Sequence, residues 1–565
     1  VKTFSLVSRE CARRDYRIPQ RRADGIVPAN LMLEEQDAIF ENGFPQDKGE
    51  PPATKETYQG AFVLDPKPGI YLDEAIAVLD YSSLYPSSQI SHNLCPSSIV
   101  LDPEYLGDAG GEKLKAMGLE YRDVTYDNYI SVRKGSGNGA TYDRKPNTLN
   151  PTTTCRFIQP KKQPDGSIVN TDRGVLPQTL QLLLSQRKAT RKKIKTEPDP
   201  FVCAVLDGLQ LAYKVTANSV YGSLGAQTNP IFFKDIAAST TATGREMLLF
   251  AKSFVLSHYP GAEIIYGDTD SIFIHFHPKD EHQQELKGQA ALEESIKLGV
   301  EAGKKATHEL QDVQKLAPQD LEYEKTFLDP IFYASKKKYI GYLYEQDPHK
   351  GKLKYMGIVL KRRDNARIVK IVYAAVIDGM LKQKSISASI QVLQSHIQRL
   401  LDHKVPLRDL IISKSLRSHY ADPQQIVHKV LADRMADRDP GNKPQANDRI
   451  PYVYIDVGDK PITVQGDRVE HPDYIREHNL KPDALFYITN QISKPVSQIY
   501  GLVVEQLPGY KYASDPHYWQ KKRRSYETDG KGHTKEWLDK KMTDMRVAMA
   551  EELLFGDYVR EEQNR

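Results

Sequence analysis

The segment EIIYGDTDSIFIHF, residues 263–276, constrains the fold more than any other part of the chain. Two runs rich in β-branched and aromatic residues, Glu263–Tyr266 and Ser271–Phe276, flank a short Gly-Asp-Thr-Asp break. Such runs, separated by turn-forming residues, are typical of a β-hairpin. We therefore predict two paired strands that carry two carboxylates, Asp268 and Asp270, at their tip.

A third carboxylate, Asp80, is predicted at the end of another strand. The segment IYLDEAIAVLD is rich in apolar and β-branched residues and is followed by a break at Tyr85-Pro86. Magnesium prefers oxygen ligands and keeps several waters, so two or three carboxylates plus substrate phosphates suffice for a site. Two such ions about 4 Å apart suit in-line phosphoryl transfer. A single aspartate at a turn is usually only a turn or capping residue, so its context must decide.

The segment KVTANSVYG places four chemically useful residues on one face of a predicted helix: Lys214, Asn218, Tyr221 and Gly222. Lysine suits a triphosphate oxygen, and tyrosine offers a flat surface to a base. Glycine lets a base pair approach the backbone, at a cost of about 1 kcal/mol in a helix. An amphipathic helix with one lysine is nevertheless more often a packed core helix, so this pattern alone proves little.

A second basic face is predicted on a helix over residues 174–195, where leucines precede a cluster of basic residues. Arg187 and Arg191 are one helical turn apart, and their guanidinium groups suit bidentate binding of phosphate. The nearby Lys188, Lys192, Lys193 and Lys195 are read as a solvated charged surface.

Two further basic runs could either contact nucleic acid or be plain surface charge. Ser335-Lys336-Lys337-Lys338-Tyr339 precedes IGYLY, and we predict that it lies on a strand facing a nucleic-acid backbone, although a plain charged surface explains it equally well. The run KKRR at 521–524 is more typical of surface charge than of a nuclear address.

The rest of the chain indicates a large multidomain protein. Its 565 residues are 39% hydrophobic, with a net charge of only +4. No segment reads as a signal peptide or a membrane span. The four cysteines are far apart in sequence, which indicates neither disulfides nor a zinc or iron–sulfur site. We expect an extended connector before about residue 55, mostly surface loop over 102–173, and mostly helix after about 366 around a strand-like IPYVYIDV.

Together, these segments resemble the B-family DNA polymerases. DYSSLYPSS (80–88), KVTANSVYG (214–222) and YGDTDSIF (266–273) resemble the three polymerase motifs of that family, in the family's order. YQGA, SKKKY, GIVLKRRDNA and RMADRDPGNKPQANDRIPYV are further matches. The resemblance covers about residues 55–500 and is closest to the eukaryotic delta type and its relatives in large DNA viruses.

The resemblance implies a role for each matching residue. Asp80 and Asp270 would hold two Mg²⁺ ions, with Asp268 as a weaker ligand, and Leu84 and Tyr85 would line the sugar pocket. The residues implied to contact the triphosphate or shape the base-pair pocket are Arg187, Arg191, Lys214, Asn218 and Tyr221. Those implied to contact DNA are Tyr58, Gly60, Gly222, Lys336, Lys337, Lys338 and Tyr339. Arg191 stands where the family usually has lysine, Lys338 where it often has arginine, and Ser88 where isoleucine is usual.

The implied fold is α+β: a right-hand polymerase with an antiparallel-sheet palm, helical fingers and a mostly helical thumb. The expected parts are a connector at 1–58, palm at 59–173 and 230–365, fingers at 174–229, thumb at 366–510 and a polar tail at 511–565. The implied partners are primer-template DNA, deoxynucleoside triphosphates and a possible sliding clamp, with no membrane. We expect a place in the nucleus or at a viral replication site.

Two absences and two alternatives complete these expectations. Few residues precede Tyr58, and the first residue is Val, so we expect a fragment without a proofreading exonuclease. The paired cysteine clusters of the delta C-terminus are also absent, which favours a viral origin. A different metal-dependent phosphotransferase or nuclease would not need the KVTANSVYG helix. A non-catalytic DNA-binding descendant of a polymerase would be expected to lose Asp80 or Asp270.

Overall fold

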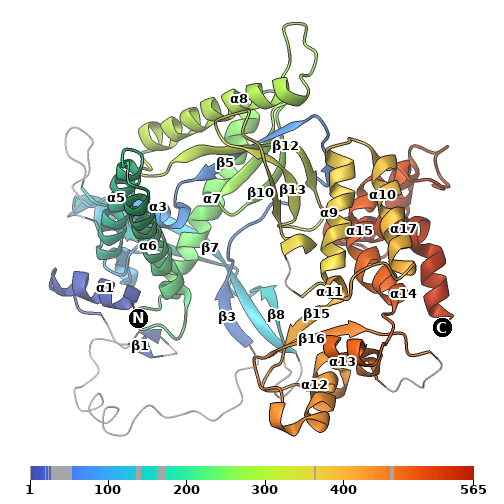
Figure 1. Ribbon diagram of the computed structural model, residues 1–565. Coiled ribbons are helices and arrows are strands. Elements are labelled where there is room, and N and C mark those ends of the chain that lie inside the picture. The colour runs from blue at the N-terminus through green and yellow to red at the C-terminus, as the bar shows by residue number, and fades with distance from the viewer. Residues whose placement is uncertain are drawn as a thin grey trace. The chain divides into compact units, whose positions relative to one another are not determined.

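The computed structural model describes residues 2–18, 21–22, 25–26, 54–134, 141–161, 173–361, 364–458 and 464–564 (Figure 1). The chain divides into two compact units. The first unit comprises Val1–Val63, Val78–Ile274 and Lys297–Glu324, and the second comprises Leu64–Ala77, His275–Ile296 and Lys325–Arg565.

A seven-stranded sheet carries the predicted hairpin. Its order is β10-β11-β5-β12-β13-β14, with β4 beside β12. The strands are β4 (Gly69–Ile70), β5 (Ala75–Tyr81), β10 (Glu263–Asp268), β11 (Ser271–His275), β12 (Leu321–Phe332), β13 (Tyr339–Tyr344) and β14 (Lys352–Met356). The run Ala75–Leu79 is fully buried, because its apolar side chains fill both faces of an interior strand. The predicted strand before Asp80 and the hairpin around Asp268 are thus confirmed.

A second sheet corrects one expectation. Residues 102–173 were expected to be mostly loop, but they contain a helix, α4 (Gly107–Ala116), and three strands of a five-stranded sheet. Its order is β3-β7-β9-β6 with β8 beside β7, and its strands are β3 (Thr54–Tyr58), β6 (Ile99–Val100), β7 (Tyr121–Lys134), β8 (Thr141–Pro146) and β9 (Thr152–Ile158). β7 was missed because its charged and polar residues give no sustained alternation. Over 121–132, the part of β7 whose side chains the structure describes, Val124 and Tyr126 are the buried residues.

The helices of the first unit pack around one core. α5 (Val175–Ile194) and α6 (Pro200–Gly225) form a helical hairpin beside α3 (Leu84–Ser91) and α7 (Lys234–His258) (Figure 1). The helix predicted over 174–195 is confirmed. α1 (Lys2–Ala12) buries Val7 and Cys11 in this core, so the expected extended connector is wrong for these residues. The expected connector over residues 27–53 lies outside the described residues. Among the remaining elements are β1 (Arg21–Arg22), β2 (Gly25–Ile26) and α8 (Gly288–His308), the last shared with the second unit.

The second unit is mostly helical after residue 366, as expected. Its helices include α9 (Arg367–Leu381), α10 (Ile386–Leu401), α12 (Val427–Arg438), α13 (Pro472–Glu477) and α15 (Ser493–Tyr500). A small sheet joins β15 (Ile412–Ser415), β16 (Arg449–Tyr454) and β17 (Val469–Glu470), which confirms the strand predicted at IPYVYIDV. The segment expected to be a polar tail contains α16 (Tyr518–Glu527) and the long α17 (Lys535–Gln563), which packs on α15. None of the described helices is long and apolar enough to span a bilayer.

Replacing Phe555 of α17 with alanine is expected to lower the free energy of unfolding by about 3–5 kcal/mol, because the ring is 1% exposed in the core of the second unit. Urea denaturation followed by tryptophan fluorescence measures this loss. Lys540→Ala, at an exposed position of the same helix, is the control and should change stability by less than about 0.5 kcal/mol. Equal stability of the two variants would contradict the packing of α17.

Candidate active site

A tight turn joins β10 to β11 and fixes two carboxylates. Asp270 N–H donates to the Asp268 carbonyl at 2.7 Å, and Thr269 between them has a φ of 62°. A positive φ is unusual for a β-branched residue and marks a constrained turn. Thr269 N–H also donates to the Phe62 carbonyl at 3.1 Å, so a segment remote in sequence helps to fix the turn. The two aspartates are half-buried and lie next to one another at this tip.

Asp80 reaches the same place from β5. The next residue, Tyr81, donates its N–H to the Asp270 carbonyl at 2.8 Å. The Tyr81 ring is buried, and its hydroxyl donates to the Met247 carbonyl at 2.8 Å, which anchors this end of β5 on α7. The structure therefore brings Asp80, Asp268 and Asp270 together, all within the first unit.

The acids at this tip crowd one another. Burial raises the pKa of the Asp270 carboxyl above its ordinary value, and the charges of Asp268 and Glu324 raise it further, whereas Lys214 lowers it. Burial and Asp320 likewise raise the pKa of Glu322, which Arg191 and Lys188 lower. Sequence reasoning missed Glu322 and Glu324; their i, i+2 spacing in LEYEK was the available signal. Crowded carboxylates whose charged forms are disfavoured are suited to a divalent cation.

Arg187 on α5 points to the start of α3. Its Nη1 donates to Ser83 Oγ at 3.2 Å and its Nε to Gln210 Oε1 of α6 at 3.3 Å. Burial and then the charge of Arg191 lower the pKa of the Arg187 guanidinium, which Glu322 raises. Arg187 and Arg191 thus face the part of the unit that holds the acids, as the basic face predicted from the sequence requires.

The predicted face of α6 is mostly exposed. Lys214, Asn218 and Gly222 are exposed, and no atom lies within 4 Å of where a Gly222 Cβ would be. Tyr221 is half-buried, and its ring centre lies 4.6 Å from that of Tyr85. The exposed positions leave room for a ligand beside α6.

Three tyrosines gather at the foot of α6. Burial raises the pKa values of the Tyr58 and Tyr221 phenols, and the two hydroxyls also act on one another's pKa. Burial, and next the charge of Asp270, raises the pKa of Tyr85 to about 12, so this phenol stays neutral at physiological pH. Tyr58 and Tyr85, predicted for different roles, therefore meet through Tyr221.

Two α7 residues that the sequence reasoning missed position this group. Arg245 donates to the carbonyls of Gln59 at 2.8 Å and Gly60 at 3.0 Å, which fixes the strand end after Tyr58. A Cβ built on Gly244 would lie 2.8 Å from Cε1 of Tyr85 and 3.5 Å from Cδ2 of Leu84. No local pattern in TTATGREM signalled either role, because both contacts are with residues remote in sequence.

Ser88 and the lysine run complete the placement of predicted residues. Buried Ser88 accepts a hydrogen bond from Gln319 Nε2 at 3.0 Å, so the hydroxyl has a partner at a position where the family usually has isoleucine.

Lys336, Lys337 and Lys338 belong to the second unit and lie in a turn before β13, so the prediction of a strand is wrong for them. Lys337 has a φ of 66°, which breaks the strand, and Lys336 pairs with Asp65 at 3.0 Å. The Tyr339 ring packs on Phe327 and Phe332.

Comparison with known proteins agrees with this arrangement. The model of the family described as DNA polymerase family B matches residues 3–503. The chain belongs to DNA polymerase family B. The family-B motifs on β5, α6 and the β10–β11 turn are thus the segments that meet in the first unit.

The family-B relatives include viral and eukaryotic proteins. A "DNA polymerase" of Pyramimonas orientalis virus is 42% identical over 99% of this chain and 44% of its own length. A "DNA polymerase" of Acanthamoeba polyphaga mimivirus is 49% identical over 44% of this chain and 14% of its own length. The "DNA polymerase delta catalytic subunit" of Candida albicans is 32% identical over 88% of this chain and 40% of its own length. The chain thus spans less than half the length of these relatives.

A solved structure shows the same fold. The family B DNA polymerase of the hyperthermophilic archaeon Pyrobaculum calidifontis matches 87% of this chain and 49% of its own chain, with a TM-score of 0.52 and 23% sequence identity. The mixed helix and sheet arrangement is therefore that of a family B polymerase.

Proposed function

We propose that this chain carries the template-directed DNA polymerase activity of its family and adds deoxynucleotides to a primer 3′ end. The observation that carries the proposal is the Tyr81–Asp270 backbone hydrogen bond, which joins the strand end bearing Asp80 to the turn bearing Asp268 and Asp270. These carboxylates share one unit with the basic faces of α5 and α6. Acids beside cationic residues suit a reaction that transfers a nucleotide from a triphosphate.

The donor set fits divalent metal. Asp80 and Asp270 would hold two Mg²⁺ ions, with Asp268 as a weaker ligand, and the fit rests on the mutual crowding of the acids around Asp270. When bound, the ions would supply charge neutralisation for the attacking and leaving oxygens. Burial is the main cause of the raised pKa of Asp270, and repulsion from Asp268 and Glu324 adds to it; bound positive charge would relieve that repulsion.

The protein's own cations would orient the incoming nucleotide. Arg187 and Arg191 of α5 and Lys214 of α6 would contact the triphosphate, and Ser83 and Gln210 would hold the Arg187 guanidinium in position. Asn218 and Tyr221 would shape the pocket of the nascent base pair, and exposed Gly222 would let that pair approach the helix. Leu84 and Tyr85 would line the sugar pocket.

The right-hand arrangement follows as part of the proposal. The fingers would be the α5–α6 hairpin within 174–229, the palm 59–173 and 230–365, and the thumb 366–510. Tyr58, Gly60, Lys336, Lys337, Lys338 and Tyr339 would contact DNA, the lysines through phosphates. A sliding clamp and a place in the nucleus or at a viral replication site would suit a replicative relative of the delta type.

Primer extension with a labelled primer-template, Mg²⁺ and four deoxynucleoside triphosphates tests the proposal. We expect lengthened primers, with one pyrophosphate released for each nucleotide added. The chain without template, or with template but no nucleotides, is the control and should yield neither product. Shortened primers and released mononucleotides in place of extension would indicate a nuclease and contradict the proposal.

Gly244→Ala is expected to lower kcat/KM for deoxynucleotide incorporation at least about tenfold, because a Cβ 2.8 Å from Cε1 of Tyr85 must displace that ring. Gly208→Ala on α6 is the matched control, since nothing lies within 4 Å of its Cβ, and it should leave kcat/KM unchanged. The Gly244 effect should also shrink in a Tyr85→Ala background. An effect of the same size with and without the Tyr85 ring would refute this positioning role.

A further inference from the structure

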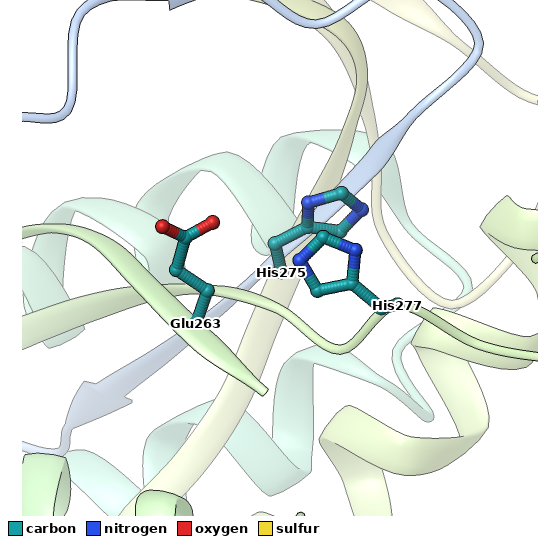
Figure 2. Close-up of side chains that lie close together, drawn as sticks. All are labelled: Glu263, His275 and His277. Atoms are coloured by element: carbon teal, nitrogen blue, oxygen red, sulfur yellow. The ribbon is translucent and has the colours of Figure 1, made fainter. Parts of the chain in front are cut away.

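A cluster of histidines and glutamates outside the proposed polymerase site lies in the second unit, at the end of β11. His275 is the last residue of β11, and His277 follows two positions later with a φ of 48°. The two rings lie close together in a tilted arrangement, with centres 3.6 Å apart and planes inclined by 31°. Figure 2 shows the pair side by side, drawn with Glu263 of β10. Two imidazoles held this close bring their nitrogens into one small volume.

One carboxylate oxygen meets both rings. Oε1 of Glu285 lies 2.7 Å from Nδ1 of His277 and 3.6 Å from Nε2 of His275. In a tetrahedral site with metal–ligand bonds of about 2.0–2.1 Å, ligand atoms lie about 3.3 Å from one another. The two nitrogen–oxygen separations fall on either side of that value, so Oε1 of Glu285 lies near ligand spacing from a nitrogen of each ring.

The remaining atoms of the cluster suit such a site. Oε2 of Glu74 lies 3.6 Å from Nδ1 of His275, the ring nitrogen that points away from Glu285. A carboxylate on the far nitrogen of a histidine is the usual support of a metal-ligating imidazole, because it fixes the tautomer. Lys287 contacts Oε2 of Glu285 at 3.3 Å and also contacts Oε1 of Glu74. The other oxygen of Glu285, Oε1, is the one that faces the histidines. His275 is buried, which holds one ligand rigidly.

We propose that Nε2 of His275, Nδ1 of His277 and Oε1 of Glu285 form a binding site for one divalent transition-metal ion of the zinc class, with the fourth position open. Two imidazoles and one carboxylate suit Zn²⁺ or Co²⁺, whereas Mg²⁺ prefers oxygen ligands alone. The site shares no residue with Asp80, Asp268 and Asp270, so it stands or falls independently of the proposed polymerase activity.

Metal binding is measured directly on the tag-free chain after chelator treatment. Co²⁺ is titrated in the presence of excess Mg²⁺, and binding is read from its visible absorption, followed by displacement with Zn²⁺. We expect one Co²⁺ per chain with the strong absorption of a four-coordinate ion, displaced by one Zn²⁺ and unaffected by Mg²⁺. The same result is expected with Asp270→Asn, which separates this site from the proposed polymerase metals.

Two ligand variants and a neighbour decide the assignment. His277→Ala and Glu285→Gln, at partly exposed positions, should each weaken Co²⁺ binding at least about a hundredfold. His282→Ala, an exposed histidine between them in sequence, should bind like the parent chain. Circular dichroism confirms that each variant is folded. The proposal is overturned if the parent binds no Co²⁺ in excess Mg²⁺, or if either ligand variant keeps the parent affinity.

Discussion

Replacing Asp270 or Asp80 with asparagine is expected to slow primer extension at least about a thousandfold, equivalent to about 4 kcal/mol of barrier, while primer-template binding persists. The reason is that the Tyr81 N–H bond to the Asp270 carbonyl joins the strand end that bears Asp80 to the turn that bears Asp270. Asparagine keeps the size of each side chain but removes the charge that would hold metal. Single-turnover extension and a DNA-binding titration give the two quantities. Asp268→Asn, the weaker proposed ligand, should lose less activity.

The free energy of unfolding of Asp270→Asn shows whether its loss of primer extension comes from misfolding. Because the pKa of Asp270 is raised by burial and by Asp268, the folded state holds its proton at pH values where the unfolded chain has lost it. The charge therefore disfavours the folded state as the pH rises through that raised pKa, and its removal should leave stability at pH 7 unchanged or higher. Extension within tenfold of the parent rate, by either variant, would contradict the assignment.

Tyr85→Ala is expected to reduce discrimination against ribonucleotides by about a hundredfold, or roughly 2.7 kcal/mol, with a much smaller loss of deoxynucleotide use. The Tyr85 ring packs at a tilt against that of Tyr221, and Gly244 lies behind it. The ring is therefore a fixed wall of the proposed sugar pocket and would clash with a 2′-hydroxyl. The ratio of kcat/KM for a deoxynucleotide and its ribonucleotide counterpart measures the effect.

Tyr85→Phe is the matched control, because it keeps the ring and removes only the hydroxyl group, which is uncharged at physiological pH. Its discrimination should equal that of the parent. If Tyr85→Ala still extends primers and discriminates as before, then the ring is only a packed aromatic before Pro86, and selection against ribose lies elsewhere.

The parts of the fold with a strong local pattern could be predicted from sequence. The hairpin around Asp268, the helix over 174–195 and the strand before Asp80 each combine clear periodicity with turn residues at their ends. β7 could not be predicted, because its polar side chains give no sustained alternation and it is held by backbone pairing to β3, β8 and β9. α17 reads as polar because it buries only a few residues, Phe555 among them, against α15.

The candidate site shows the same division. The chemistry-bearing residues Asp80, Asp270, Arg187 and Lys214 stand out by type and spacing, and the resemblance to a family orders them. The supporting contacts depend on residues far apart in the chain: Arg245 holds the Gly60 carbonyl, and Gly244 makes room for Tyr85. Local pattern cannot reveal such contacts, because only the fold brings the partners together. The strand prediction for Lys336–Lys338 was wrong for a related reason, since the local sequence does not show that Lys337 adopts a turn conformation.

Incorporation of a single nucleotide opposite each of the four template bases tests the central claim most directly. The chain, Mg²⁺ and a primer-template are mixed with one deoxynucleoside triphosphate at a time, and the primer is resolved at single-nucleotide length. The account predicts that each template base directs addition of its complement above the other three, and that Asp270→Asn adds none at the same enzyme concentration. Addition that ignores the template base, or that persists in Asp270→Asn, would contradict it.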